Sequence, residues 1–594
     1  MPLQCQTKEA NIKMESIYLY ELTQDATPYA YDEALAVACM QGLWNRTGPH
    51  LYVFCRDDEE HRNGVAGDAD WGLKHLKRPQ CTPLYWLEVL SKEGEWLQGR
   101  EKVRLHSLEE LYQLSRDVIR GAVVWDPDVP ATVNVATTIA GVEDLVVLSP
   151  ELYIEFGVKM GLALVHDLRG RFDGSETGSA RNDAYRWAIR EYVDTGLCSS
   201  EVVGLHFDAW VNRGIGNTSY VLERDRLIAE RAFVFDLSPW ADFAPLSDPD
   251  QPLGTDLATY QLLLERVCQQ AGGRHMTELC GFFNHRALRE GQPNGVLSEW
   301  ETVRLISEYN FYQNTAANDV YNQSFHRFAP MPNLKQHRPK ASRQLENKVY
   351  MCIQICDMDS TTPLYDVCPV LWDDPRRGEY PLAWGLNPNL YGVLPDIYAH
   401  YYRTASENDY FCADAGAAGY FNPTRIRSKY WPMVAEHNKY WFERTDTTIA
   451  GMVLDCDNPT KEVLRYFAKF APDGFASLVC SGIHPPCNPP VRGHIFDEMP
   501  IGFMTHAACD WEGLEKTCEA LNRFYFHKFS PGRAHFVYYR ITYRSPSELF
   551  DLYDRIRQTN PELEVELVDP YTYFDLLRQK YLRDVSECAE DVML

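Results

Sequence analysis

The sequence predicts an α/β protein in which small N-terminal α/β modules precede a (β/α) barrel-like domain. Two observations support this prediction. Short apolar segments alternate along the 594 residues with segments whose apolar residues recur at helical spacing. The short segments are apolar on both faces instead of alternating with polar residues, which is typical of parallel strands covered by helices on both sides of a sheet.

The first part of the chain divides into three predicted modules. Residues 14–105 open with a strand at Ser16–Tyr20, a helix at Tyr31–Arg46 and a second strand at His50–Phe54. Residues 106–155 contain a helix that starts at Ser107, with Glu110 placed to complete a capping box, and then two short strands. Residues 156–224 form the third module around a predicted helix at residues 182–194.

Residues 225–594 are predicted to form one barrel-like domain. Nine apolar segments follow one another here, mostly separated by amphipathic stretches, as expected for a closed or slightly irregular barrel. The predicted strands are Arg231–Asp236, His275–Leu279, Lys348–Asp357, Asp409–Asp414, Thr448–Asp455, Gly474–Cys480, Ile501–His506, His535–Arg540 and Glu564–Asp569.

Composition excludes several classes of partner. The formal net charge is -26, with 84 acidic and 58 basic residues, so the protein should repel nucleic acid and anionic membranes. No apolar run approaches the roughly 20 residues of a membrane span. The polar N-terminus lacks a signal-peptide pattern and the 17 cysteines form no C-x-x-C pair, so we expect a cytoplasmic protein with reduced thiols. A homo-oligomer is compatible with the sequence, and no cofactor is expected.

Missing motifs narrow the chemistry further. The chain has no G-x-S-x-G nucleophile elbow and no phosphate-binding G-x-x-x-x-G-K-[ST] loop. No two of the 17 histidines are four residues apart, which excludes H-E-x-x-H zinc proteases.

Carboxylates follow several of the predicted strands. Asp236, Asp357 and Asp414 each close a strand, and Asp359 lies two residues beyond Asp357. Because the carboxyl ends of parallel strands line the active sites of α/β folds, we expect these four side chains to face one cavity. Neighbouring carboxylates also shift one another's pKa, so one can act as an acid while another acts as a base or nucleophile. The alternative role for each Asp is to cap the following helix or turn.

Two further segments contain candidate substrate-binding residues. The irregular stretch from Asp357 to Leu390 is too long for a simple connection, and long loops in compact domains are usually functional. A capping-box pattern from Ser298 to Glu301 places two more candidates in the first turn of a helix. The candidates of these two segments are Trp372, Asp373, Asp374, Arg376, Trp384, Glu299 and Trp300. Trp384 is expected either to stack on a sugar ring or to plug the barrel mouth.

The most specific feature is the turn in residues 409–423, DYFCADAGAAGYFNP. Its small residues allow the backbone to approach a ligand closely. The turn resembles the motif of the GxGYxYP putative glycoside hydrolases: Gly419, Tyr420 and Pro423 match, whereas Ala417 and Asn422 replace its first Gly and second Tyr. Similar blocks extend over most of the chain. The resemblance implies several small N-terminal modules before the motif-bearing domain, and a carbohydrate substrate.

The leading hypothesis is hydrolysis of a glycosidic bond by two carboxylates, one an acid and one a base or nucleophile. Asp357 and Asp359 are the first candidates, followed by Asp414 and Glu299. The remaining candidates, Asp236, Gly419, Tyr420 and Asn422 among them, would position the substrate. Two alternatives stay open: a metal-dependent sugar hydrolase, deacetylase or isomerase with Asp357 and Asp359 as ligands, and a non-catalytic carbohydrate-binding or scaffold protein.

Overall fold

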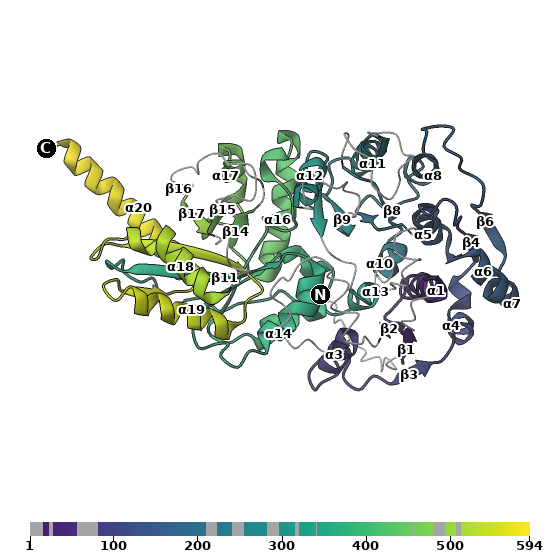
Figure 1. Cartoon of the computed structure of the whole chain (residues 1–594), viewed down its shortest axis with the longest axis horizontal. Helices are drawn as coiled ribbons and strands as arrows, with labels where there is room; N and C mark the ends of the chain where they lie inside the picture. Colours follow the sequence, from purple (N-terminus) through teal and green to yellow (C-terminus); the bar gives the residue numbers. More distant parts are fainter. Residues whose placement is uncertain are drawn as a thin grey trace, which may run out of the picture.

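The computed structural model contains four parallel sheets arranged along the chain (Figure 1). It describes residues 16–22, 28–55, 81–208, 223–239, 255–281, 296–314, 320–339, 341–453, 455, 457–478, 494–505 and 513–593. The three sheets of the first 314 residues occupy one half of the molecule, and the largest sheet occupies the other. The predicted fold class is confirmed.

The first sheet has the order β2-β1-β3, with all strands parallel. Its strands are β1 (Ile17–Leu22), β2 (Leu51–Cys55) and β3 (Lys102–Leu105), and its helices are α1 (Pro28–Trp44) and α3 (Thr82–Val89). β2 is buried along its whole length, which explains why its sequence shows no polar alternation.

The second sheet has the order β5-β4-β6. Its elements are α4 (Leu108–Ser115), β4 (Gly121–Val124), α5 (Thr132–Glu143), β5 (Leu145–Leu148) and β6 (Leu164–Asp167). Ser107 caps α4 by accepting a hydrogen bond from the Glu110 backbone N–H, as predicted. Because β6 pairs with β4, this sheet extends beyond the predicted module boundary at residue 155.

The third sheet has the order β10-β9-β7-β8. Its strands are β7 (Val202–Leu205), β8 (Phe233–Phe235), β9 (Thr277–Gly281) and β10 (Phe311–Asn314). The accompanying helices are α8 (Ala180–Ala188), α10 (Arg224–Ala229), α11 (Thr255–Ala271) and α12 (Val296–Ser307). The structure therefore differs from the predicted barrel boundary at residue 225. β8, β9 and β10 share a separate sheet with β7, because strand–helix alternation looks the same in a small open sheet and in a barrel.

The fourth sheet is a nearly closed parallel barrel with the order β13-β12-β11-β18-β17-β15-β14. The strands are β11 (Val349–Met358), β12 (Leu382–Leu386), β13 (Asp409–Cys412), β14 (Ile449–Met452), β15 (Gly474–Leu478), β17 (Met499–Thr505) and β18 (His535–Thr542). Two backbone hydrogen bonds join the outer strands, from the Ala413 N–H to the Ile449 carbonyl and from the Gly451 N–H to the Gly416 carbonyl, both 3.1 Å. The short strands β16 (Ile495–Phe496) and β19 (Val565–Leu567) pair with β17 and β11.

Helices surround this barrel. They are α14 (Cys368–Trp372), α15 (Pro395–Thr404), α16 (Trp431–Thr445), α17 (Lys461–Phe467), α18 (Leu514–Phe524), α19 (Pro546–Thr559) and α20 (Pro570–Met593). No helix of the described residues combines the length and the apolar character that a membrane crossing requires.

Alternate residues of the barrel strands belong to different cores. On β11, Ile353 and Ile355 pack in the cluster formed with surrounding helices, whereas Tyr350 and Cys352 belong to a second cluster. That second cluster also contains Cys412, Tyr538 and the α20 residue Phe574, so it fills the barrel interior and α20 contributes to it. Continuing the same alternation, Gln354 of β11 and Arg540 of β18 point inward above these apolar residues.

The N-terminal modules contact the barrel directly. The Trp86 indole N–H of α3 donates to the Tyr365 carbonyl at 2.7 Å, and Tyr365 lies in η8 (Pro363–Val367), which follows β11. On the other side, Gln313 of β10 and Tyr420 exchange two backbone hydrogen bonds of 2.8 and 3.1 Å. Both contacts lie beyond carboxyl ends of barrel strands, so the modules pack against that end of the barrel.

Candidate active site

Asp357 lies where β11 loses its regular pairing. The register with β12 shifts between Ile355 and Met358, and Asp357 has a left-handed backbone with φ of 65°. Such a conformation is uncommon for a residue other than glycine and is typical of a bulge that redirects a side chain. The Asp357 carboxylate accepts hydrogen bonds from Arg540 Nη2 at 2.8 Å and from Thr542 Oγ1 at 3.2 Å. Its side chain keeps 33% of its surface exposed.

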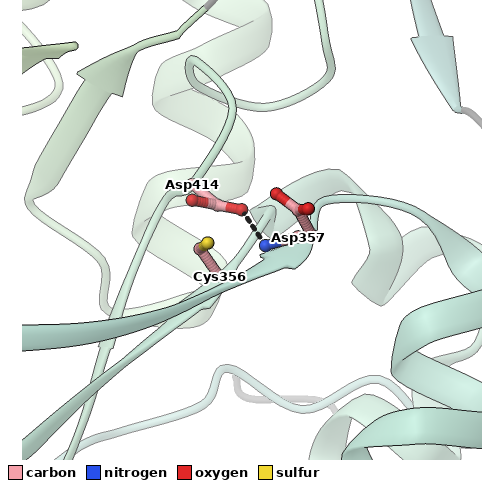
Figure 2. Close-up of side chains that lie close together, drawn as sticks. All are labelled: Cys356, Asp357 and Asp414. Atoms are coloured by element: carbon pink, nitrogen blue, oxygen red, sulfur yellow. Dashed lines mark hydrogen bonds between the residues drawn. The ribbon is translucent and has the colours of Figure 1, made fainter. Parts of the chain in front are cut away.

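Asp414 lies next to Asp357 and is completely buried. Its Oδ2 accepts the Asp357 backbone N–H at 2.6 Å, the contact drawn in Figure 2. Its Oδ1 accepts from Gln354 Nε2 at 2.9 Å. The absent side chain of Gly385 makes room for this pair, since a Cβ there would lie 2.7 Å from Gln354 Nε2 and 2.9 Å from Asp414 Cβ. The structure thus brings Asp357 and Asp414 together at one end of the barrel.

Arg540, on β18, connects the two carboxylates. Its Nε and Nη2 donate to the two Asp414 oxygens at 3.0 and 3.1 Å, while Nη2 also donates to Asp357. These anions raise the pKa of the buried guanidinium well above its usual value, although burial opposes the shift. Arg540 therefore remains charged and compensates the buried Asp414.

Burial and neighbouring charges shift the pKa values of Asp414 and Tyr543. Burial raises the pKa of Asp414, and the Asp357 charge adds to this effect, while Arg540 opposes it. Tyr543 donates its hydroxyl to the Asp357 carbonyl at 3.1 Å, and after burial the charges of Asp357 and Asp359 raise its pKa most. Asp359 therefore lies close enough to act on the same group.

Cys356, Asp357 and Asp414 are close enough to be tested as a metal site, with one ligand atom each within 4.8 Å (Figure 2). Burial raises the pKa of the Cys356 thiol well above its usual value, which disfavours the thiolate that a metal would require. Arg540 already supplies positive charge to both carboxylates. The three side chains are therefore better suited to binding the Arg540 guanidinium than to binding a metal ion.

The turn of residues 415–422 lies between the barrel and the third sheet and contacts both. Gly419 has φ of 110°, and a Cβ there would lie 2.4 Å from the Tyr312 ring. The Ala418 backbone N–H donates to Asn438 Oδ1 at 2.7 Å, and the Asn422 N–H donates to Ser307 Oγ at 2.9 Å. The glycine is required by this close approach.

Two family models match the chain in the regions of this turn and of the second sheet. Residues 347–578 match the "GxGYxYP putative glycoside hydrolase C-terminal domain", and residues 119–195 match the "GxGYxYP_N second domain". Together the matched ranges cover just over half of the chain. The chain belongs to the GxGYxYP family. The resemblance noted in the sequence is thereby confirmed.

Solved structures add information on the fold. A putative hydrolase from Bacteroides thetaiotaomicron is similar over 95% of both chains, with a TM-score of 0.67 and 15% identity. At this identity the likeness shows a shared fold. The peptidoglycan deacetylase PdaC from Bacillus subtilis aligns over 41% of this chain and 96% of that chain at 9% identity. Its TM-score of 0.20 is too low to indicate a shared fold. No curated protein matches the chain.

Asp236 does not join the Asp357 group. It follows β8 in the third sheet, where its Oδ1 lies 3.4 Å from Arg181 Nη2 and its Oδ2 accepts the Asp208 N–H at 3.1 Å. Burial, together with the neighbouring Asp208 and Asp256, raises its pKa to about 7 against the pull of Arg181. The expectation of one shared cavity fails for Asp236 because β8 lies outside the barrel.

The candidate tryptophans are core residues. Trp384 is fully buried, and its indole N–H donates to Asp409 Oδ1 at 2.8 Å. Trp372 packs against it with ring centres 4.8 Å apart, in the cluster between barrel and helices. Trp384 lies on the outward face of β12, so neither sugar stacking nor plugging of the barrel mouth describes it.

The charged residues of the same loop form a local network. Asp374 accepts from the backbone N–H of Arg376 and from the Ser547 hydroxyl, at 2.9 and 2.7 Å. The Arg376 guanidinium pairs with Glu379 and Asp551 instead of with the Asp357 group, and Asp373 is exposed. Their substrate-binding role receives no support from these contacts.

Of the remaining candidates, Tyr420 and Asn422 are buried in the turn described above. Glu299 and Trp300 lie on α12, but their side chains are outside the described residues. Arg540 and Gln354 are not among the residues predicted from the sequence, because every catalytic candidate was chosen as a carboxylate. The available signal was the position of Arg540 at the end of a predicted strand.

Proposed function

We propose that the protein hydrolyses glycosidic bonds, with Asp357 as the carboxylate that faces the substrate. One observation supports this choice most. Asp357 is the partly exposed member of a buried charged network at the carboxyl end of a parallel barrel, which is where enzymes of this architecture place their catalytic groups. The family description of putative glycoside hydrolase agrees with the proposed reaction class.

The contacts suggest a division of roles among the three carboxylates. Arg540 and Thr542 both donate to the Asp357 carboxylate and hold it in place, as a base or nucleophile requires. Asp359, two residues further on, is the proposed acid that gives a proton to the leaving oxygen. Asp414 has no exposed surface, so its proposed role is to position Asp357 through the backbone N–H and to anchor Arg540.

The proposal is tested with Asp357→Asn on a panel of chromogenic glycosides and natural oligosaccharides. The substitution is nearly isosteric and removes only the charge. A carboxylate that stabilises the transition state should lose 10³-fold or more in rate, which corresponds to about 4 kcal/mol. The matched control is Asp373→Asn, an exposed acid of the same chain that should leave the rate unchanged.

Melting temperature is measured on the same samples. A well-folded Asp357→Asn protein with near wild-type turnover would show that Asp357 does no chemistry. Assays with and without a chelator test the metal-dependent alternative, and equal rates are expected because Arg540 already neutralises the carboxylates.

A further inference from the structure

Among the described residues, the buried side-chain Nδ2 group of Asn387 has no hydrogen-bond partner, and it lies at the same end of the barrel as Asp357. It directly follows β12, two residues beyond the inward-facing Gly385. Its Oδ1 accepts the Asp414 backbone N–H at 2.9 Å, and its own backbone N–H donates to the Met358 carbonyl at 3.4 Å. These contacts place the Asn387 side chain between the strand ends that carry both acids.

The Asn387 Nδ2 group has no hydrogen-bond partner in the described part of the chain, and the residue has no exposed surface. An unpaired buried N–H group costs about 1–3 kcal/mol, so such groups are rare unless a ligand or water completes them. The neighbouring Asp357 carboxylate is an acceptor. A hydroxyl can both donate and accept a hydrogen bond. The Nδ2 donor and the Asp357 acceptor together therefore suit a ligand with adjacent hydroxyls.

The charges around this amide argue against an anionic substrate. Among the described residues, Arg540 is the cation that contacts Asp357 and Asp414, and its guanidinium is already hydrogen-bonded to both. The two carboxylates and the one guanidinium therefore leave this end of the barrel with a net negative charge. A carboxylate, sulfate or phosphate on the sugar would therefore meet net repulsion at this end of the barrel.

We infer that Asn387 donates a hydrogen bond from Nδ2 to a hydroxyl of an uncharged sugar bound against Asp357. The inference rests on the proposed function, whose substrate class it narrows to neutral glycosides. Asn387 would then set specificity for the hydroxyl that it binds, while its Oδ1 continues to hold the Asp414 backbone.

Binding is measured calorimetrically with methyl 1-thioglycosides of glucose, galactose, mannose and xylose, which lack the cleavable oxygen link. Their monodeoxy analogues and the glucuronic and galacturonic acid counterparts complete the set. We expect at least one neutral sugar to bind, and its uronate counterpart to bind at least tenfold more weakly. Asn387→Ala should weaken binding of the parent sugar about tenfold. It should leave the affinity for one deoxy analogue unchanged, because that analogue lacks the hydroxyl that Asn387 would bind.

The matched control is Asn408→Ala. Asn408 immediately precedes β13, at the opposite end of the barrel, and its Nδ2 donates to the Gly378 carbonyl at 2.7 Å, so this variant should bind every sugar as the wild type does. If Asn387→Ala weakens all analogues by the same factor, the residue is only structural and the inference is wrong. Uronates that bind as tightly as neutral sugars would also overturn it. In both cases the proposed function survives, whereas a failure of every sugar to bind would remove both.

Discussion

Replacing Arg540 with methionine should lower the free energy of unfolding, because the buried Asp414 carboxylate would lose its compensating charge. The substitution keeps most of the side-chain volume but removes the three hydrogen bonds that Nε and Nη2 make with Asp414 and Asp357. Asp414 has no exposed surface, so within the described part of the chain its charge would keep only Gln354 and a backbone N–H as donors. Breaking a buried ion pair from one side typically costs about 3–5 kcal/mol, and we expect a loss of unfolding free energy in that range.

Urea unfolding followed by near-ultraviolet circular dichroism measures this loss. Arg376→Met provides the matched control, because Arg376 pairs with Glu379 and Asp551 on the surface and should cost at most about 1 kcal/mol. The double variant Arg540→Met with Asp414→Asn removes both charges, and it should be about 2 kcal/mol more stable than the sum of the single losses predicts. A loss below about 1 kcal/mol for Arg540→Met, or strict additivity in the double variant, would refute the account of Arg540 as the compensating charge.

Three further predictions concern other parts of the fold. Gly419→Ala should cost about 2–5 kcal/mol, because its Cβ would overlap the Tyr312 ring at a positive φ, and an unchanged melting temperature would contradict this. Burial raises the pKa of Asp455 from 3.8 to about 6, so its contribution to stability is complete below pH 3.8 and is lost as the pH rises through about 6. The stability difference between wild type and Asp455→Asn should therefore change by up to about 3 kcal/mol between pH 4 and 7, and a pH-independent difference would show that the carboxyl is not perturbed. Trp384→Phe should lower stability by about 1–3 kcal/mol through the lost contact with Asp409 while sugar affinity stays unchanged, and calorimetry would expose a role in binding.

Much of the fold could be predicted from local patterns. Apolar strands that alternate with helices indicated parallel sheets. In a parallel sheet the carboxyl ends of neighbouring strands lie at the same edge. For that reason Asp357 and Asp414, 57 residues apart, were expected together, and the structure places them in contact. The small residues of the turn also predicted a close backbone approach. In the structure Gly419 has φ of 110° and lies against the Tyr312 ring, where only a small residue fits.

The element types, the α/β class and the acids at the strand ends can be predicted from local sequence, because they depend on burial and backbone preferences within a few residues. Which strands share a sheet is known only from the three-dimensional fold, which places Asp236 outside the site and Trp384 against the helices. The fold also brings Arg540, 183 residues beyond Asp357, into contact with both acids. Such contacts depend on strand order and register between distant segments, for which the local pattern carries no signal.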